Sequence, residues 1–345
     1  MSKILDVAID TCVFFKMIEY NNFVEAYGEK YLSQLITLKE KELKDIKTDI
    51  RASLGTDFFK KYENLPFEHQ IEKYKSYATN IESRCLNGMN EAMELANNAQ
   101  TEEDQMKYFQ IYENYYNQLN ALLGDSTINE NLIKINEYRM QKDIVEVGKI
   151  YQAALNGEFD LYCNFIAFDE VLYHTQRRDN PHFLTYDLSE VNALTDRVVK
   201  VVSTKSQDVL DIVDMLAQEY RTGNGRVNEK PMDADVNSLD EFGDSKIAAF
   251  SNLTGMILIT LNGKDFIFDK GYRWGNDNIR KHLQYTNSKY DFTTDASVYS
   301  PKELLEGKVN TPQIQSKILN YVDISENSTY GNNRENEEEN VNELS

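Results

Sequence analysis

The sequence predicts an α/β fold in which a central, mostly parallel sheet is interrupted by an all-helical insertion. An apolar strand opens the chain at Ile4–Ile9 and leads directly into a helix. An unbroken apolar run at Met256–Ile259 follows a second helix, and such a run is typical of a strand covered on both faces of a parallel sheet. Between these two segments, residues 31–140 carry helical periodicity with little strand signal.

The opening strand ends in polar residues. Its last apolar residue, Ile9, is followed by Asp10 and Thr11, and then by the apolar start of a helix. In open α/β sheets, ligands bind just outside the carboxyl ends of the strands. The sequence therefore marks Asp10 and Thr11 as candidate site residues.

The insertion is predicted to be helical throughout. Apolar residues recur at helical spacing over its first part, and Thr101-Glu-Glu-Asp104 resembles a capping box that opens a helix. Another helix is expected over Leu132–Leu155, with a stop at Asn156-Gly157. One stripe of the helix after Thr101 consists of Tyr108, Tyr112, Tyr115, Tyr116, Leu119 and Leu123. This spacing favours helix packing over stacking of the tyrosines on nucleic-acid bases.

The late segment places polar residues at a second strand end. Asp244 begins a helix that ends at Gly255, and the strand Met256–Ile259 follows. The exit from this strand carries Thr260, Asn262 and Asp265. If the two strands belong to one parallel sheet, these residues lie at the same edge as the end of the opening strand.

Together, these segments resemble the PIN-domain nucleases, a family that includes many bacterial toxin ribonucleases. The resemblance rests on Asp-Thr-x-Val-Phe after the opening strand and on Asp-x-x-Ile-Ala-Ala, Gly, Ile-Thr-x-Asn-x-x-Asp-Phe over Asp244–Phe266. Gly157–Phe168 resembles the family's segment before the second acidic position, Phe183–Leu194 its next strand and helix, and Val298–Leu305 its closing strand and helix. The matching core would comprise residues 1–30 and 141–307, with the insertion at 31–140 and an extension at 308–345.

The resemblance implies a PIN-like three-layer fold and a divalent-metal-dependent endoribonuclease that hydrolyses phosphodiester bonds of single-stranded RNA. Its cofactor would be Mg²⁺ or Mn²⁺, because these cations prefer oxygen ligands. The metal ligands would be Asp10, Glu170, Asp244, Asn262 and Asp265, and the four acidic residues among them would be catalytic. Thr11, His174 and Thr260 would be auxiliary residues.

The second acidic position departs from the family pattern. His174 stands at the spacing where the family has Glu, and Glu170 lies one helical turn earlier. Both residues share one helix face, so either could reach the site. Glu170 is the natural cation ligand, whereas His174 could bind a transition metal, shuttle a proton or serve only a structural role. Glu190 is a third, more distant candidate.

Basic residues near the same sheet edge are candidate phosphate contacts. Arg177 and Arg178 follow the second strand, and Lys264 and Arg273 follow the last motif. Phosphate contacts position a nucleic acid without reading its sequence. The alternative is that these side chains are solvated surface charges.

The composition limits the function. The 345 residues carry a net charge of −20, which argues against a broad basic surface that grips nucleic acid. Val322–Ser345 holds seven of the acidic residues and one arginine, and we expect disorder from about residue 322. The three cysteines have no paired spacing, and no apolar run could span a bilayer, so a cytoplasmic protein with reduced thiols is expected.

Three functional hypotheses follow. The first is the metal-dependent nuclease, and the second is a catalytically degenerate member of the same fold that binds or scaffolds. The third is an acidic helical protein that binds partners, in which the nuclease-like motifs are accidental. A protein partner or inhibitor and an oligomer are compatible with the first two, whereas membrane attachment is not expected.

Overall fold

The computed structural model describes residues 5–53, 60–124, 126–176, 186–223, 243–261, 298–309 and 322–325. The helices are α1 Thr11–Tyr27, α2 Leu32–Ser53, α4 Phe67–Asn97, α5 Glu102–Leu123, α6 Ser126–Leu155, α7 Phe165–Gln176, α8 Leu188–Arg197, α9 Gln207–Gly223, α10 Gly243–Thr254 and α12 Pro301–Leu305, with a 3-10 turn η1 at Glu29–Tyr31. The strands are β1 Leu5–Ile9, β2 Phe159–Asn164, β3 Val199–Ser203, β4 Ile257–Ile259, β5 Val298–Tyr299 and β6 Asp323–Ser325. Among these residues, no helix has the length and apolarity needed to cross a membrane.

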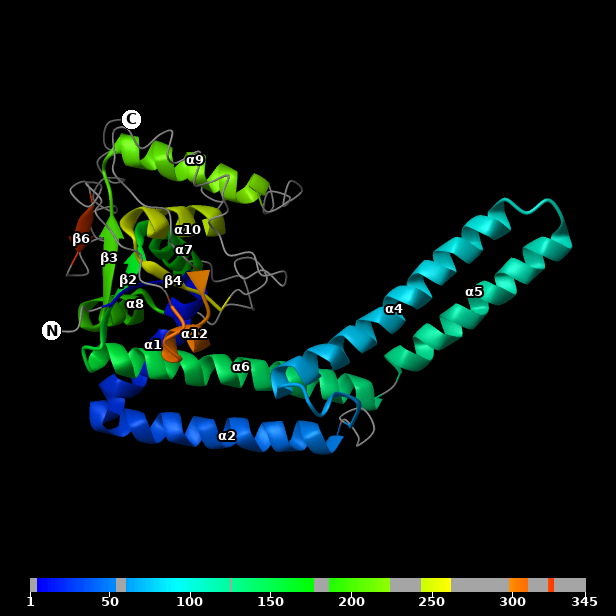
Figure 1. Cartoon of the computed structure of the whole chain (residues 1–345), viewed down its shortest axis with the longest axis horizontal. Coiled ribbons are helices and arrows are strands. Elements are labelled where there is room, and N and C mark those ends of the chain that lie inside the picture. The colour runs from blue at the N-terminus through cyan, green and yellow to red at the C-terminus, as the bar shows by residue number, and fades with distance from the viewer. Residues whose placement is uncertain are drawn as a thin grey trace. The chain divides into compact units, whose positions relative to one another are not determined.

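The strands form one six-stranded sheet in the order β5-β4-β1-β2-β3-β6. All neighbouring pairs are parallel except β3 and β6. Figure 1 shows β3 rising toward α9, which follows its carboxyl end. The predicted α/β class with a mostly parallel central sheet is therefore confirmed.

The strand order reverses direction at β1. The chain passes outward from β1 through β2 to β3, and it then returns to the other side of β1 to form β4 and β5. Ile9 at the end of β1 lies in register with Ile259 at the end of β4. In open α/β sheets, ligand sites lie outside the carboxyl ends of the strands at such a reversal.

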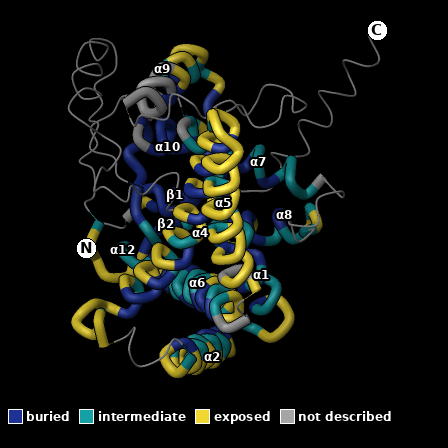
Figure 2. The backbone as a smooth tube through the Cα atoms, turned by 90° about the vertical axis from the view of Figure 1, so that its right-hand side faces the viewer, coloured by how far each residue is buried: buried dark blue, intermediate teal, exposed yellow. Residues whose placement is uncertain are grey.

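The chain divides into two compact units, one comprising Met1–Ile36 and Asp143–Ser345 and the other Thr37–Lys142. This division lies within a few residues of the predicted boundaries at 31 and 140. The second unit contains an apolar cluster formed by Ile50, Phe67, Ile71, Tyr74, Ile135 and Tyr138. It also contains an antiparallel hairpin of α4 and α5, here called the arm, and α5 is largely exposed (Figures 1 and 2).

The end of α6 packs closely on α1 within the first unit. The Tyr20 hydroxyl donates a 2.7 Å hydrogen bond to the carbonyl of Ile144. A Cβ at Gly148 would overlap the ring of Tyr20, so the glycine permits this approach. The predicted stop of this helix is also confirmed, since Gly157 has φ of 74° after Leu155.

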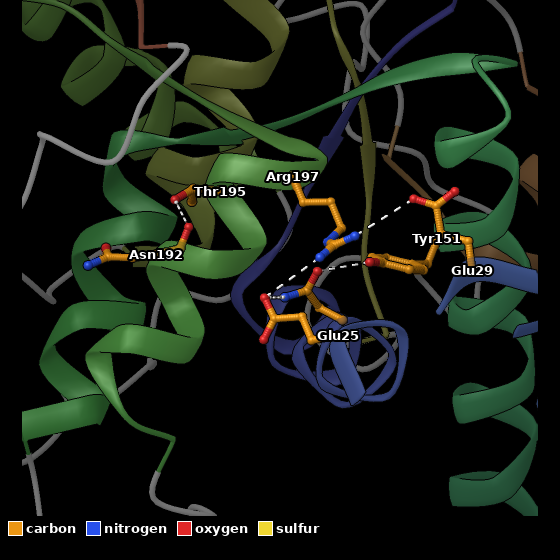
Figure 3. Close-up of polar contacts among 7 residues, drawn as sticks. Glu25, Glu29, Tyr151, Asn192, Thr195 and Arg197 are labelled. Atoms are coloured by element: carbon orange, nitrogen blue, oxygen red, sulfur yellow. Dashed lines mark hydrogen bonds and ion pairs between the residues drawn. The ribbon is translucent and has the colours of Figure 1, made fainter. Parts of the chain in front are cut away.

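A polar cluster joins α1 to α6 and α8 near the end of α1 (Figure 3). The guanidinium of Arg197 lies 3.8 Å from Glu25 and 3.7 Å from Glu29. The Tyr151 hydroxyl donates a 2.9 Å bond to the buried side chain of Asn21. These contacts attach α6 and α8 to α1, and Arg197 lies just before the amino end of β3 rather than at a carboxyl end, so we assign the cluster a structural role.

Two segments differ from the sequence predictions. The predicted disorder from about residue 322 is wrong for Asp323–Ser325, which pair antiparallel with β3 as β6. Main-chain groups at a sheet edge can pair with a polar segment, because the ladder does not require apolar side chains. Val199–Ser203 forms β3, a strand that the sequence analysis did not anticipate.

Candidate functional site

Asp10 lies directly after β1, at the reversal point of the sheet. Its backbone N–H donates a 3.0 Å bond to the Ile259 carbonyl of β4, which extends the ladder by one residue. Its side chain is 3% exposed, so Asp10 is not a surface acid. Oδ1 accepts a 2.8 Å bond from the Thr11 N–H and thereby caps α1.

The second oxygen of Asp10 is held by side chains. The Thr260 hydroxyl, at the end of β4, donates a 2.7 Å bond to Oδ2. The Cys12 thiol donates to the same oxygen over 3.0 Å, and its sulfur accepts a 3.4 Å bond from the Leu261 N–H. The ends of β1 and β4 therefore meet at one carboxylate.

Thr11 connects Asp10 to a second carboxylate. Its hydroxyl donates a 2.6 Å bond to Oε2 of Glu170 on α7. The other oxygen of Glu170 lies against Gly243, the first residue of α10, where an added Cβ would overlap it. Glu170 thus lies between the start of α1 and the start of α10.

Asn164 organises the same edge of the sheet from the end of β2. It is 2% exposed, and its Oδ1 accepts a 2.9 Å bond from the Ala167 N–H in the first turn of α7. Its Nδ2 donates to the Ile247 carbonyl over 3.1 Å and to the Ser251 hydroxyl over 3.2 Å, both on α10. One buried amide therefore fixes α7 and α10 relative to the strand end.

The carboxylates make this edge electrically negative. Burial raises the pKa of the Cys12 thiol well above its usual value, and the charge of Asp10 raises it further. Burial is also the largest cause that raises the pKa of Cys163 on β2, and the charges of Asp10, Glu170 and Asp169 raise it further. Both thiols are kept protonated because a thiolate would be poorly solvated and repelled by these acids.

The structure brings some of the predicted site residues together and places others elsewhere. Asp10, Thr11, Glu170 and Thr260 form one hydrogen-bonded group through the contacts above. Asp244 lies in the first turn of α10, next to Gly243, and its side chain is half-buried.

Glu170 and His174 on α7 were both candidates for the second acidic position, and their neighbours in the structure distinguish them. Glu170 bonds to Thr11, whereas the ring of His174 lies 6.1 Å from that of Phe15 and 5.8 Å from that of Tyr173. Glu190 caps α8 and accepts a bond from Asn22 on α1. Of the three candidates for the second acidic position, Glu170 is therefore the one that lies beside the Asp10 group.

Several predicted residues lie outside the described residues. They are the ligands Asn262 and Asp265 and the basic residues Arg177, Arg178, Lys264 and Arg273. Within the described part of the chain, no three His, Cys, Asp or Glu side chains are grouped so that they could hold a metal ion. The full predicted ligand set therefore stays a prediction.

The oxygen atoms at this edge are of a type that hard cations accept. The carboxylates of Asp10 and Glu170 are the kind of ligand that Mg²⁺ and Mn²⁺ prefer, and the hydroxyls of Thr11 and Thr260 hold these carboxylates in place. Asp10 and Glu170 are the described residues that would hold such an ion.

Three residues of the site were missed by sequence reasoning. Cys12 follows the recognised Asp-Thr pair, and Gly243 precedes Asp244, so each lies beside a predicted residue. Asn164 carries one signal that could have identified it, a polar residue directly at the end of an apolar strand segment. Their contacts with Asp10, Glu170 and α10 depend on tertiary structure, which local sequence patterns do not specify.

The geometry of the site is the basis for assigning a function, since no relative supplies one. No protein-family model, no curated protein and no solved structure matches the chain. The resemblance to PIN-domain nucleases therefore stays a prediction based on the quoted motifs.

Proposed function

We propose that this protein is a metal-dependent endonuclease that hydrolyses phosphodiester bonds, with single-stranded RNA as its substrate. One observation carries the proposal: Asp10 at the end of β1 is bonded to Thr260 at the end of β4, at the point where the strand order reverses. Polar side chains that converge at such a reversal are typical of ligand sites in open α/β sheets.

The described residues have distinct roles in the proposed reaction. Asp10 and Glu170 would hold the Mg²⁺ or Mn²⁺ ion, and Thr260 and Thr11 orient their carboxylates through the 2.7 Å and 2.6 Å bonds. The ion, when bound, supplies an activated water and stabilises charge on the leaving oxygen. Asp244, at the start of α10, and Asn262 and Asp265 complete the proposed ligand set.

The net charge of −20 is compatible with an RNA substrate if cations neutralise the site. The acidic group at the sheet edge repels a phosphate in the absence of a cation, because Asp10 and Glu170 share this edge. Binding of RNA should therefore require the divalent ion. This requirement separates the proposed enzyme from proteins that bind nucleic acid through basic patches.

Cleavage of labelled single-stranded RNA by the purified full chain with Mn²⁺ tests the proposal. Asp10→Asn should abolish cleavage, because the amide removes the negative charge that binds the ion while keeping the size of the side chain. Asp6→Asn is the matched control, since Asp6 is exposed on the same strand. Equal cleavage by the wild type and Asp10→Asn would reject the assignment of the site.

A second candidate function is a catalytically degenerate protein of the same fold that serves as a binding or scaffolding module without the metal ion. The observation that favours it is the burial of Asp10, whose two oxygens already accept bonds from Thr11, Cys12 and Thr260. Such a carboxylate could act purely as a structural bridge between β1 and β4. Calorimetry with Mn²⁺ distinguishes the two, because the proposed enzyme binds the ion through Asp10, whereas a purely structural carboxylate does not.

A further inference from the structure

The arm formed by α4 and α5 hides small side chains and exposes large apolar ones. Its buried seam on α4 consists of Ala78, Cys85, Gly88, Ala92 and Ala96. By contrast, Leu86 is 43% exposed, Phe109 39% and Tyr116 47%. The small residues on the α4 side of the seam bury little apolar area, and several large apolar residues of the arm stay available to a partner.

Six of the arm's larger apolar residues make up one surface, here called the patch. On α4, Leu86, Met89 and Met93 are spaced i, i+3 and i+7, and on α5, Phe109, Tyr112 and Tyr116 have the same spacing. Residues at this spacing share one helix face. The rings of Tyr112 and Tyr116 stack with centroids 6.3 Å apart, so the two tyrosines lie side by side on this face.

A contact across the seam shows that both triads lie on the same side of the arm. Gly88 and Tyr115 lie on the flanks of α4 and α5 opposite to the triads, and they touch, since a Cβ at Gly88 would overlap the Tyr115 ring. The helix faces that carry Gly88 and Tyr115 meet on one side of the arm. The faces that carry Leu86, Met89 and Met93 on α4 and Phe109, Tyr112 and Tyr116 on α5 therefore both point to the opposite side of the arm. The patch is therefore continuous over both helices.

The charge around the patch indicates the kind of partner. Between Leu86 and Leu123 the chain has six acidic residues and one basic residue, Lys107, hence a net charge of −5. Three exposed acidic residues share the helix faces of the patch by their spacing and form its acidic rim: Glu82 on α4, and Glu102 and Glu113 on α5. Two copies of the arm would repel each other, whereas a basic partner would be attracted.

We propose that the patch binds a basic amphipathic helix of another protein. The apolar face of that helix lies on Leu86, Phe109, Tyr116 and their half-buried neighbours, and its lysines or arginines face the acidic rim. Methionine and aromatic residues suit this mode, because they supply adaptable and large apolar contacts. This interaction is independent of the proposed nuclease activity.

The test uses the full chain and a fluorescent peptide of about 18 residues made of leucine and lysine, with leucines at helical i, i+3, i+4 and i+7 spacing. A scrambled peptide of the same composition and a leucine–glutamate peptide are the peptide controls. Leu86→Ser with Phe109→Ser alters the patch. Leu95→Ser with Ile111→Ser is the matched control, because Leu95 and Ile111 are also exposed on the arm, 49% and 36%, but lie outside the patch.

The amphipathic basic peptide should bind the full chain with a dissociation constant on the order of micromolar. Binding should weaken about ten-fold or more in the patch variant, stay within about two-fold in the control variant, and weaken with added salt. Equal binding of the scrambled peptide would mean that charge alone attracts it and would overturn the proposal. Dimers of the full chain that dissociate in the patch variant would also overturn it, by placing a second copy on the patch.

Discussion

The hydroxyl of Thr260 donates a 2.7 Å hydrogen bond to Oδ2 of Asp10, although 250 positions separate the two residues in sequence. Both side chains are buried, at 0% and 3% exposure. The bond joins the ends of the two strands between which the strand order reverses. It couples the stability of the sheet to the geometry of the candidate site.

Replacing Thr260 with Val should destabilise the fold by about 1–3 kcal/mol, because a buried carboxylate loses a hydrogen-bond donor. Thr260→Ser keeps the hydroxyl and should have a smaller effect. Urea unfolding of the wild type and both variants measures the difference. A Thr260→Val variant as stable as the wild type would show that the bond to Asp10 does not stabilise the fold.

Asn164→Ala should cost about 3 kcal/mol of unfolding free energy, because it removes the buried bonds to Ala167, Ile247 and Ser251 and leaves their partners unsatisfied. Asn98→Ala is a matched substitution at an exposed side chain bonded to its own helix. That control should stay within about 0.5 kcal/mol of the wild type. A similar loss in both variants would argue against the bridging role of Asn164.

Gly243→Ala should change the site more than the stability of the fold. The new Cβ displaces the Glu170 carboxylate from Thr11, but Glu170 is long and flexible, so the stability should change by less than about 1 kcal/mol. If Glu170 binds the ion, the affinity for Mn²⁺ should fall about ten-fold, as calorimetry can measure. Unchanged affinity in this variant and in Glu170→Gln would remove Glu170 from the proposed ligand set.

The stability of the protein should fall as the pH rises above about 9. The pKa of Cys163 is raised by burial and by the charges of Asp10, Glu170 and Asp169, so the folded state retains a proton that the unfolded state releases above 9.0. The unfolding free energy then decreases by at most about 1.4 kcal/mol per pH unit for this group. Urea unfolding at several alkaline pH values should show a shallower decrease for Cys163→Ala, and an identical decrease would contradict this linkage.

Gly88→Ala should loosen the arm, because the added methyl group overlaps the ring of Tyr115. Overpacking of this kind typically costs about 1–3 kcal/mol. Hydrogen exchange of the α5 amides, compared with those of α1, should accelerate in Gly88→Ala. Combining it with Tyr115→Ala should restore part of the protection by removing the clash, and the absence of any rescue would show that the seam is not packed as described.

Local patterns predicted much of the fold. The opening strand, the strand after Gly255, the end of α6 at Leu155 and the cap of α5 at Thr101 all appear where the sequence indicated them. These features depend on periodicity, glycine conformation and capping, which act over a few residues. β6 was not predicted, because its polar residues carry no local strand pattern and its pairing depends on β3. β3 was missed although its valines form a β-branched run that is a local strand signal.

The sequence by itself determined that Asp10 ends a strand, that Asp244 begins a helix and that the segment between the two core parts is helical. Only the tertiary structure decided that Thr260 binds Asp10, that Glu170 rather than His174 lies beside it, and that Asn164 fixes α7 and α10. The physical reason is distance along the chain. Strand and helix formation follow from neighbouring residues, whereas these contacts depend on the strand order β5-β4-β1-β2-β3, which long-range packing selects.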